Sequence, residues 1–321
     1  MSDDRRLLPL KLHLSLLALA SCGAGLVVLA TSRYGAGLSP DSVAYVSVAR
    51  NLIAGLGFLD YSSEPFVMWP PAYPCLLACL GLVTGSDPLV SAKFLGAVLH
   101  GSLVYATGLL FSRLVPGRFA FALVVASFVA FSLPVLQVSV MAWSEPLFVF
   151  FVLLAFFHAN NYHAKKNTTN LLLLALSVGL ACLTRYIGVT LLLWGALLIM
   201  FQRVSLRRRA SHLFLFLITS ATPLGIWAIR NFVISGTLFG PRSPSGYSLA
   251  QNVKRAANGI LAFFVPAPFL FHFTLKVIVL VVATAFVSAV VFVFLAEWRN
   301  LKAMLGPAVP LGLFVVIYTA F

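Results

Sequence analysis

The chain has 321 residues, of which 61% are hydrophobic and only 9% carry a charged side chain. Soluble domains contain roughly 25% charged residues, so this composition excludes a water-soluble globular protein. The net charge is +14, but no basic stripe interleaves with aromatic residues in a soluble module, so the charge does not indicate a nucleic-acid-binding protein.

Long apolar segments recur along the chain and predict an all-α fold, a polytopic bundle of transmembrane helices. A helix needs roughly 20 apolar residues to cross the hydrocarbon layer. Segments of about this length without Asp, Glu, Lys or Arg are Leu12–Ser32, Phe94–Ser112, Phe119–Ser144, Ser211–Ile229, Val277–Ala296 and Ala303–Phe321. Shorter segments that cross if polar flanks are included or the bilayer thins are Pro146–His158, Thr168–Thr184 and Ile187–Gln202. We therefore expect about nine spans, in a single transmembrane domain over residues 1–321.

The basic residues orient the predicted bundle, because short cytoplasmic loops carry an excess of Lys and Arg. With the N-terminus in the cytoplasm, the cytoplasmic segments hold Arg5, Arg6, Lys11, Arg113, Arg118, Lys165, Lys166, Arg203, Arg207, Arg208, Arg209, Arg299 and Lys302. The opposite, exoplasmic side holds Asp41, Asp60, Glu64, Asp87 and Glu145, five of the eight acidic residues. A site that uses carboxylates is therefore expected on the exoplasmic face of the membrane. In a bacterium, this membrane would be the inner membrane.

One further segment affects this topology. Ala256–Leu275 is uncharged and long enough to cross, and a crossing there would invert everything after it. Pro266 and Pro268 interrupt it, and a crossing would place Arg299 and Lys302 outside, against the charge pattern. We interpret this segment as an exoplasmic interfacial or re-entrant element.

Two long exoplasmic loops are predicted, at about 32–88 and 231–274, and loops of this length are usually functional. In the first loop, Ser39-Pro40-Asp41 is a helix-start signal, with Pro at the first helical position and an acid in the first turn. Apolar residues then follow at helical spacing: Val43, Val46, Ala49, Leu52 and Ile53, opposed by Ser42, Ser47, Arg50 and Asn51. This pattern predicts an amphipathic juxtamembrane helix on the membrane surface, which ends at Gly55 and Gly57. The Pro70-Pro71 bend then leads into a short apolar helix, Cys75–Val83.

An ordered series of short motifs carries a family resemblance. The series is Asp41 with Tyr45, Ala49 and Gly55-Leu56-Gly57, Pro70-Pro71, Lys93, Ser144-Glu145-Pro146-Leu147-Phe148, Leu183-Thr184-Arg185-Tyr186-Ile187-Gly188, and Trp227-Ala228-Ile229-Arg230-Asn231 before Gly236. It resembles the GT-C membrane glycosyltransferases, in particular the branch with protein O-mannosyltransferases and lipid A aminoarabinose transferases. The resemblance covers about Leu12–Gly240. It implies a polyprenyl-phosphate sugar donor and transfer on the exoplasmic face.

Two carboxylates are the candidate catalytic residues, Asp41 and Glu145. Inverting transfer needs a carboxylate base on the acceptor hydroxyl, opposite a departing phosphate stabilised by cations. Asp41 is the candidate base, although an acid there also complements the helix dipole, worth about 0.3–1 kcal/mol. The family often has a second acid directly after this position, where this chain has Ser42, so a role for that carboxylate is in question.

Glu145 is an acid at a helix entry that, in the resembling family, faces the active site. It is expected to position the acceptor or, with Asp41, to hold a divalent metal, and the alternative is a solvated loop acid. Two carboxylates are too few ligands to require a metal, so the cofactor stays open.

The candidate substrate-binding residues are Tyr45, Lys93, Arg185 and Arg230. Each arginine stands at a predicted exoplasmic helix end, where a guanidinium suits the oxygens of a lipid phosphate. Lys93 is a weaker candidate for the same role, binding of the lipid phosphate. The alternative for these cations is that they snorkel to the membrane interface.

The predicted function is therefore a glycosyltransferase that moves a sugar from a polyprenyl-phosphate donor to an unidentified protein, lipid or glycan acceptor. The alternative is a multi-span transporter of a small or lipid-linked substrate, for which internal repeats and broken polar helices near the midplane are typical. Here the polar signals gather in the exoplasmic loops instead. The chain ends at Phe321 within an apolar run, and GT-C relatives are usually longer, so we expect a missing C-terminal part.

Overall fold

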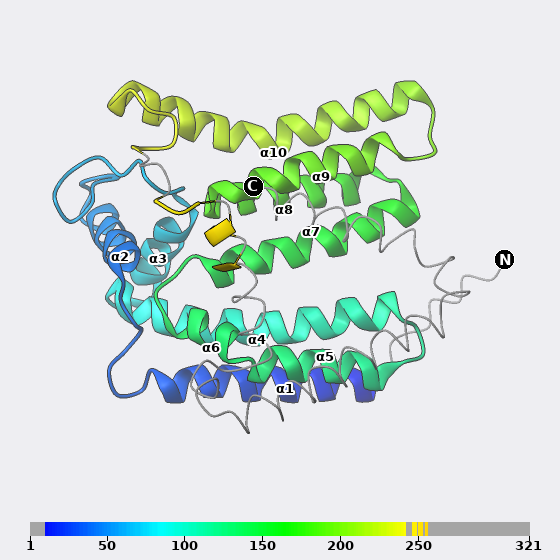
Figure 1. Ribbon diagram of the computed structural model, residues 1–321, viewed down its shortest axis with the longest axis horizontal. Coiled ribbons are helices and arrows are strands. Elements are labelled where there is room, and N and C mark those ends of the chain that lie inside the picture. Colours follow the sequence, from blue (N-terminus) through cyan, green and yellow to red (C-terminus); the bar gives the residue numbers. More distant parts are fainter. Residues whose placement is uncertain (1–9, 242–245, 249, 253, 256–321) are drawn as a thin grey trace.

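A computed structural model describes residues 10–241, 246–248, 250–252 and 254–255 of the chain. The described residues fold into helices, with two isolated β-bridges and no sheet (Figure 1). This confirms the all-α fold class. The segments predicted at Ala256–Leu275, Val277–Ala296 and Ala303–Phe321 lie outside the described residues, so the total of about nine spans stays a prediction.

Four helices of the described part are long and apolar enough to cross a membrane. They are α1 (Leu10–Ala30), α4 (Pro88–Leu114), α7 (Glu145–Lys165) and α10 (Leu206–Ser235). A helix of 21 residues, such as α1 or α7, is about 31 Å long and so matches a hydrocarbon layer of about 30 Å. Three shorter apolar helices belong to the described part of the bundle: α8 (Thr168–Thr184), η1 (Tyr186–Gly188) and α9 (Val189–Met200).

The span expected at Phe119–Ser144 is not one straight helix. The chain forms α5 (Phe119–Phe131) and α6 (Leu133–Val140), bent by 51° at the break, and together they can make a fifth span. Ser132 between them has an extended backbone, and Pro134 lacks the N–H that would continue the helical hydrogen bonds. The short segment Pro146–His158 was expected to cross only with its polar flanks, and α7 does include them, since the helix continues past His158 to Lys165.

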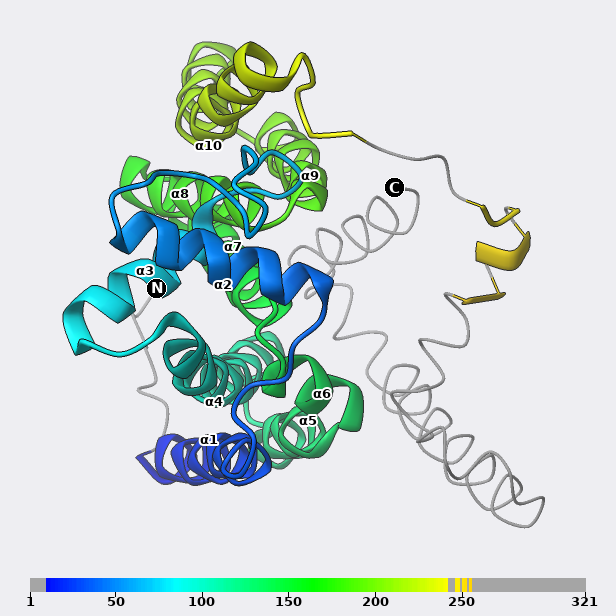
Figure 2. The ribbon, with the colours of Figure 1, turned by 90° about the vertical axis from the view of Figure 1, so that its left-hand side faces the viewer.

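Two helices lie across one end of the bundle rather than within it. Figure 2 looks at this end and shows α2 (Pro40–Ile53) crossing the bundle helices, which appear nearly end-on, with α3 (Ala72–Thr84) beside it. The predicted start of α2 is confirmed, since the Ser39 hydroxyl accepts a hydrogen bond from the Ser42 backbone N–H at 3.4 Å and Pro40 opens the helix.

The buried face of α2 differs from the expected apolar stripe. Ser42, Tyr45, Val46 and Ala49 are buried at helical spacing, whereas Val43 is 40% exposed. The Tyr45 ring causes this rotation, because it packs edge-on against aromatic rings of α3 and of the preceding loop. Tertiary packing therefore sets the phase of the helix more strongly than its hydrophobic pattern does.

Small residues let the bundle helices pack closely. A Cβ on Gly101 of α4 would lie 3.0 Å from the Ala20 carbonyl of α1, and one on Gly179 of α8 would lie 3.2 Å from the Ser220 carbonyl of α10. Glycine at such contacts brings helix backbones together, which is how helices associate where lipid removes the hydrophobic driving force. The α1–α4 and α8–α10 pairs therefore form a rigid frame for the end that carries α2.

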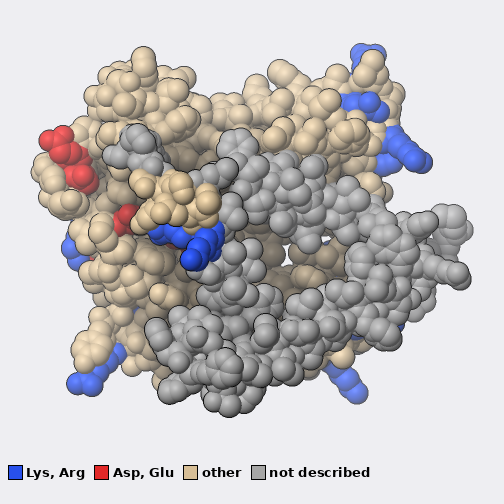
Figure 3. All heavy atoms as spheres, viewed as in Figure 1, with Lys and Arg blue, Asp and Glu red and all other residues tan. Residues whose placement is uncertain are grey.

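Charge is distributed unevenly along the bundle. All five carboxylates of the described residues lie at or beside the end that carries α2 and α3: Asp41, Asp60, Glu64, Asp87 and Glu145. On the face drawn in Figure 3 the red side chains are confined to this end, and blue side chains occur at both ends. The carboxylates predicted to share one side of the membrane therefore do share one end of the molecule.

Candidate active site

The segment before α2 is joined to the segment before α7. Gly37 donates its backbone N–H to the Val140 carbonyl and accepts from the Ala142 N–H, both at 2.9 Å. Next to this bridge, the Trp143 indole N–H donates to the Ser39 hydroxyl at 2.7 Å. These bonds hold the first turn of α2, with Asp41, beside the first turn of α7, with Glu145.

Tyr45 lies at the centre of the resulting cluster. It is buried, and its hydroxyl is 3.3 Å from the Ser144 hydroxyl. Arg185, which caps the end of α8, donates to the same Ser144 oxygen at 3.4 Å and forms an ion pair with Glu145. The Tyr45 phenol also lies within electrostatic reach of Arg185, Asp41 and Glu145. The structure thus brings together four of the residues singled out from the sequence.

The two tyrosines of this cluster are neutral hydrogen-bonding groups. Burial raises the pKa of the Tyr45 hydroxyl, although its hydrogen bond with Ser144 and the charge of Arg185 oppose the shift. Burial likewise raises the pKa of Tyr73, which packs against Tyr45 with ring centroids 5.2 Å apart. Neither phenol can act as a base near neutral pH, so a base at this site must be a carboxylate.

Asp41 is the carboxylate that is free to act. Its side chain is exposed, and no described residue hydrogen-bonds or ion-pairs with it, whereas Glu145 is engaged by Arg185. Glu145 instead fixes the guanidinium of Arg185, whose side chain is still 36% exposed. A planar guanidinium held in this way can present its remaining N–H groups to phosphate oxygens. The site therefore offers one free carboxylate and one oriented cation.

Comparisons with known proteins agree with this architecture. No protein-family model and no curated protein sequence matches the chain. The protein O-mannosyltransferase Pmt1-Pmt2 complex of S. cerevisiae, solved with its sugar donor, matches with a TM-score of 0.57 and 18% identity over 73% of this chain. ArnT from Cupriavidus metallidurans, solved in the apo state, matches with a TM-score of 0.62 and 14% identity over 95% of this chain.

The chain has a GT-C-like fold. Both matched structures are GT-C membrane glycosyltransferases, and with the apolar helices they make this chain an integral membrane protein. At these identities the likeness establishes the fold and not the substrate. The chain spans 35% of the length of the matched yeast chain and 54% of that of ArnT.

Arg230 holds a different position in the GT-C-like fold from the one expected of a free phosphate ligand. Its Nη1 donates to the Phe66 carbonyl at 2.7 Å and to the Asn231 side chain at 3.0 Å. Its guanidinium carbon lies 4.6 Å from the centre of the Trp227 ring and 5.4 Å from that of Phe58. Arg230 therefore ties the end of α10 to the loop between α2 and α3, and its role as a phosphate ligand stays a prediction.

Lys93 is not brought into the cluster by any hydrogen bond or ion pair of the described residues. It lies on α4, half-buried, with its ammonium 5.5 Å from the centre of the Phe94 ring. Its role in substrate binding also stays a prediction.

Several residues of the site were not found from the sequence. Ser144 belongs to the motif that contains Glu145 but was given no role, Trp143 directly precedes that motif, and Tyr73 follows the Pro70-Pro71 bend, so the available signal was their position in or next to the motifs. Tyr186 is a further case, since its hydroxyl donates to the Val67 carbonyl at 3.2 Å and accepts from the Trp227 indole at 3.2 Å. No local sequence pattern predicts contacts between residues so far apart in the chain.

A divalent metal is not built into the described side chains. Among the residues that the structure describes, no group of three or more His, Cys, Asp or Glu could hold a metal ion. Asp41 and Glu145 are the carboxylates of the cluster, and Arg185 already engages Glu145. Magnesium can bind through one or two carboxylates with substrate phosphates, so the GT-C-like site alone gives no complete ligand set.

Proposed function

We propose that the protein is a glycosyltransferase that moves a sugar from a polyprenyl-phosphate donor to an acceptor hydroxyl on the exoplasmic face of the membrane. The observation that carries the proposal is the cluster of Asp41, Tyr45, Glu145 and Arg185 at one end of a bundle with a GT-C-like fold. A lipid-linked donor suits this place, because α2 lies at the bundle end, where the head group of a lipid would stand.

In the proposed reaction Asp41 removes the proton from the acceptor hydroxyl while the acceptor oxygen attacks the anomeric carbon of the donor sugar. The bond from that carbon to the phosphate oxygen breaks, and its electron pair leaves on the lipid phosphate. Arg185 stabilises the negative charge that develops on the phosphate. A single base on the side opposite the leaving group implies inversion at the anomeric carbon.

The remaining residues of the cluster act as positioning residues. Glu145 and Ser144 hold the guanidinium of Arg185 through an ion pair and a hydrogen bond. Tyr45, neutral and buried, shares the Ser144 hydroxyl and so links α2 to this pair. Such a supporting shell keeps the base and the cation in fixed geometry, which is a precondition for rate enhancement by orientation.

A transporter is the less favoured reading of the same chain. Its substrate site is typically near the bilayer midplane, at broken helices. In the described part of the chain the carboxylates and their partners lie at the end of the bundle instead. The arrangement therefore favours chemistry at the membrane surface over passage through the bundle.

The test is transfer by the purified protein with a panel of radiolabelled polyprenyl-phosphate sugars and membrane acceptors. Asp41→Asn should reduce transfer by about 10² to 10⁴, because the amide cannot take the proton of the acceptor. Asp60→Asn is a matched control, since within the described residues the Asp60 side chain accepts backbone hydrogen bonds from Ser62 and Glu64, which an amide oxygen also accepts. Transfer from a soluble nucleotide sugar without any polyprenyl lipid would refute the donor class. Turnover of folded Asp41→Asn within about threefold of wild type would remove Asp41 as the base.

A further inference from the structure

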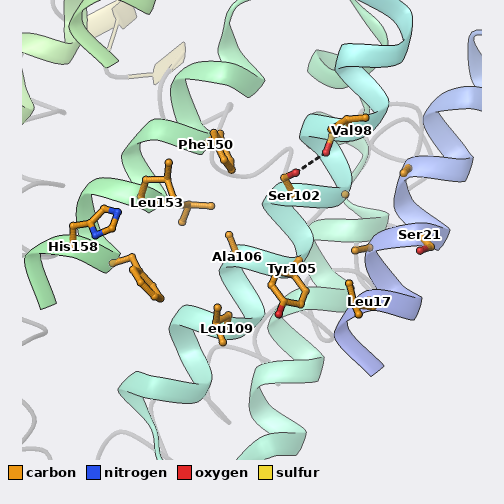
Figure 4. A pocket seen from close by; sticks show the side chains of 15 residues that line it. Leu17, Ser21, Val98, Ser102, Tyr105, Ala106, Leu109, Phe150, Leu153 and His158 are labelled. Atoms are coloured by element: carbon orange, nitrogen blue, oxygen red, sulfur yellow. Dashed lines mark hydrogen bonds between the residues drawn. The ribbon is translucent and has the colours of Figure 1, made fainter. Parts of the chain in front are cut away.

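A cavity of about 570 Å³ lies between α1, α4 and α7, and no residue of the candidate active site lines it (Figure 4). Apolar side chains form most of its wall, among them Leu17 of α1, Ala106 and Leu109 of α4, and Leu153 and Phe157 of α7. A predominantly apolar cavity of this size is in the range of small-molecule and lipid sites. Because it lies between membrane-crossing helices, the ligand class that can reach it is a hydrocarbon chain.

Of the few polar groups in the wall, two have hydrogen-bond partners and one, which marks one end of the cavity, has none among the described residues. The Ser102 hydroxyl donates to the Val98 carbonyl of its own helix at 2.8 Å, and the Tyr105 hydroxyl is 2.8 Å from Nδ1 of His13. His158 differs, since its Nδ1 is buried and has no hydrogen-bond partner in the described part of the chain. Buried polar groups are normally paired, so this nitrogen indicates a missing polar partner at that end.

The end with His158 lies far from the catalytic cluster. His158 follows Glu145 by 13 positions on α7, which corresponds to about 20 Å along the helix axis. A donor whose sugar reaches Asp41 would keep its phosphate at the opposite end of the bundle. The occupant of the cavity is therefore a lipid with its head group on the other membrane surface.

A cation stands where that head group would be. The guanidinium carbon of Arg113, in the last turn of α4, lies 4.1 Å from the centre of the Phe157 ring, and Phe157 lines the cavity. Arg113 is exposed and forms no ion pair with a described carboxylate, all of which lie at or beside the other end of the bundle. An arginine in this setting can bind a phosphate through several N–H groups.

We propose that this cavity holds one acyl chain of an anionic phospholipid whose phosphate binds Arg113. The lipid belongs to the leaflet opposite the active site, which is the cytoplasmic leaflet in the orientation proposed above. Basic pockets between transmembrane helices on that side are suited to anionic head groups. The lipid is a structural ligand of the α1–α4–α7 interface and takes no part in sugar transfer.

The test measures lipid retention by native mass spectrometry after purification from nanodiscs that contain equal amounts of phosphatidylglycerol and phosphatidylcholine. Wild type should retain phosphatidylglycerol preferentially, and Arg113→Gln should lower that preference by about fivefold. Arg33→Gln is the matched control, because Arg33 also lies over an aromatic ring, 5.1 Å from the centre of Tyr34, but at the active-site end. It should retain the lipid as wild type does.

A second variant tests the acyl-chain part independently. Ala106→Phe places a ring in the cavity and should reduce retention of both phospholipids, with folding checked by its melting temperature. Equal retention of the two phospholipids by wild type, or retention unchanged by Arg113→Gln, would overturn the proposal. Preferential retention of added undecaprenyl phosphate over phosphatidylglycerol would overturn the assigned occupant. No sugar donor is present, so the result does not depend on the proposed transferase activity.

Discussion

Trp143 donates its indole N–H to the Ser39 hydroxyl at 2.7 Å, and the two residues stand two positions before Glu145 and Asp41 respectively. One hydrogen bond therefore fixes the position of the start of α7 relative to the start of α2. Ser39 is also the N-cap of α2, so the same hydroxyl that begins the helix fixes its position over the bundle.

Removal of this hydrogen bond should reduce turnover more than stability. Trp143→Phe keeps the aromatic packing but loses the donor, at a cost of about 0.5–1.5 kcal/mol. Because a misplaced base loses rate steeply, we expect kcat to fall by about tenfold or more. Ser39→Thr keeps both the cap and the acceptor and should stay close to wild type. A Trp143→Phe protein with the wild-type kcat would show that this contact does not position the base.

The Glu145–Arg185 pair predicts a specific pattern of kinetics. Arg185→Gln should raise KM for the lipid donor, since it removes the cation proposed to bind the phosphate, and Glu145→Gln should give a smaller increase. The double variant should resemble Arg185→Gln, because Glu145 acts through Arg185. Both side chains are about one-third exposed, so the melting temperatures of these variants should differ little from that of wild type. Strictly additive effects on KM would indicate that Glu145 contacts the substrate directly.

Arg230 offers a choice between two roles that one pair of variants separates. If it ties α10 to the loop, Arg230→Lys should loosen the loop around Phe66, because an ammonium cannot reproduce the planar contacts of a guanidinium. A cysteine at Ser62 would then react faster with a thiol reagent, and donor binding would change little. If Arg230 binds phosphate, the charge kept in Arg230→Lys should preserve most donor binding, whereas Arg230→Gln should lose it.

Arg50 and Asp87 predict a pH-dependent contribution to stability. Arg50 donates Nε and Nη2 to the Asp87 carboxylate at 2.8 and 3.0 Å, joining α2 to the start of α4. The hydrogen bond from Arg50 lowers the pKa of Asp87. A lowered folded-state pKa means stabilisation that is present above the unfolded pKa of about 3.9 and is lost as the pH falls through the folded value. The melting temperature of wild type should therefore fall more than that of Asp87→Asn between pH 6 and pH 3, by a small margin because the pair is exposed.

The proposed orientation has a direct chemical test. In a variant without its four native cysteines, a cysteine at Ser62 should react with a membrane-impermeant thiol reagent applied from the exoplasmic side, and one at Asn167 should not. Both positions are exposed, and they lie at opposite ends of the bundle. The reverse labelling would place the candidate site in the cytoplasm.

Local signals in the sequence predicted some elements closely. The cap Ser39 with Pro40 and Asp41 predicted the start of α2, and the uncharged run Thr168–Thr184 coincides with α8. These features depend on residues that are neighbours in the chain. Pro134 also signalled the break after α5, but a hydropathy criterion alone reads through a single proline.

The assembly of the site was predictable only in part. The alternation of basic and non-basic loops along the chain indicated that Asp41 and Glu145 share one end of the molecule, because loops on the same side of a membrane share the same charge bias. Charge alternation carries no information on the ion pair between Arg185 and Glu145, on the contacts of Arg230, or on which face of α2 is buried. Each of these depends on residues from distant helices. Hydrophobic periodicity describes how a helix meets its environment and not which side chain it meets there.

The hydrogen bond from Arg230 to the Phe66 carbonyl spans 164 positions of the chain. At a synthesis rate of about 5–20 residues per second, the loop around Phe66 waits on the order of ten seconds before its partner is made. During that time α3 to α9 are produced while the loop has neither its guanidinium nor the Trp227 ring beside it. The last turns of α10 therefore close the end with the candidate active site late in biogenesis, and in a chain halted before Arg230 the loop around Phe66 would lack this contact.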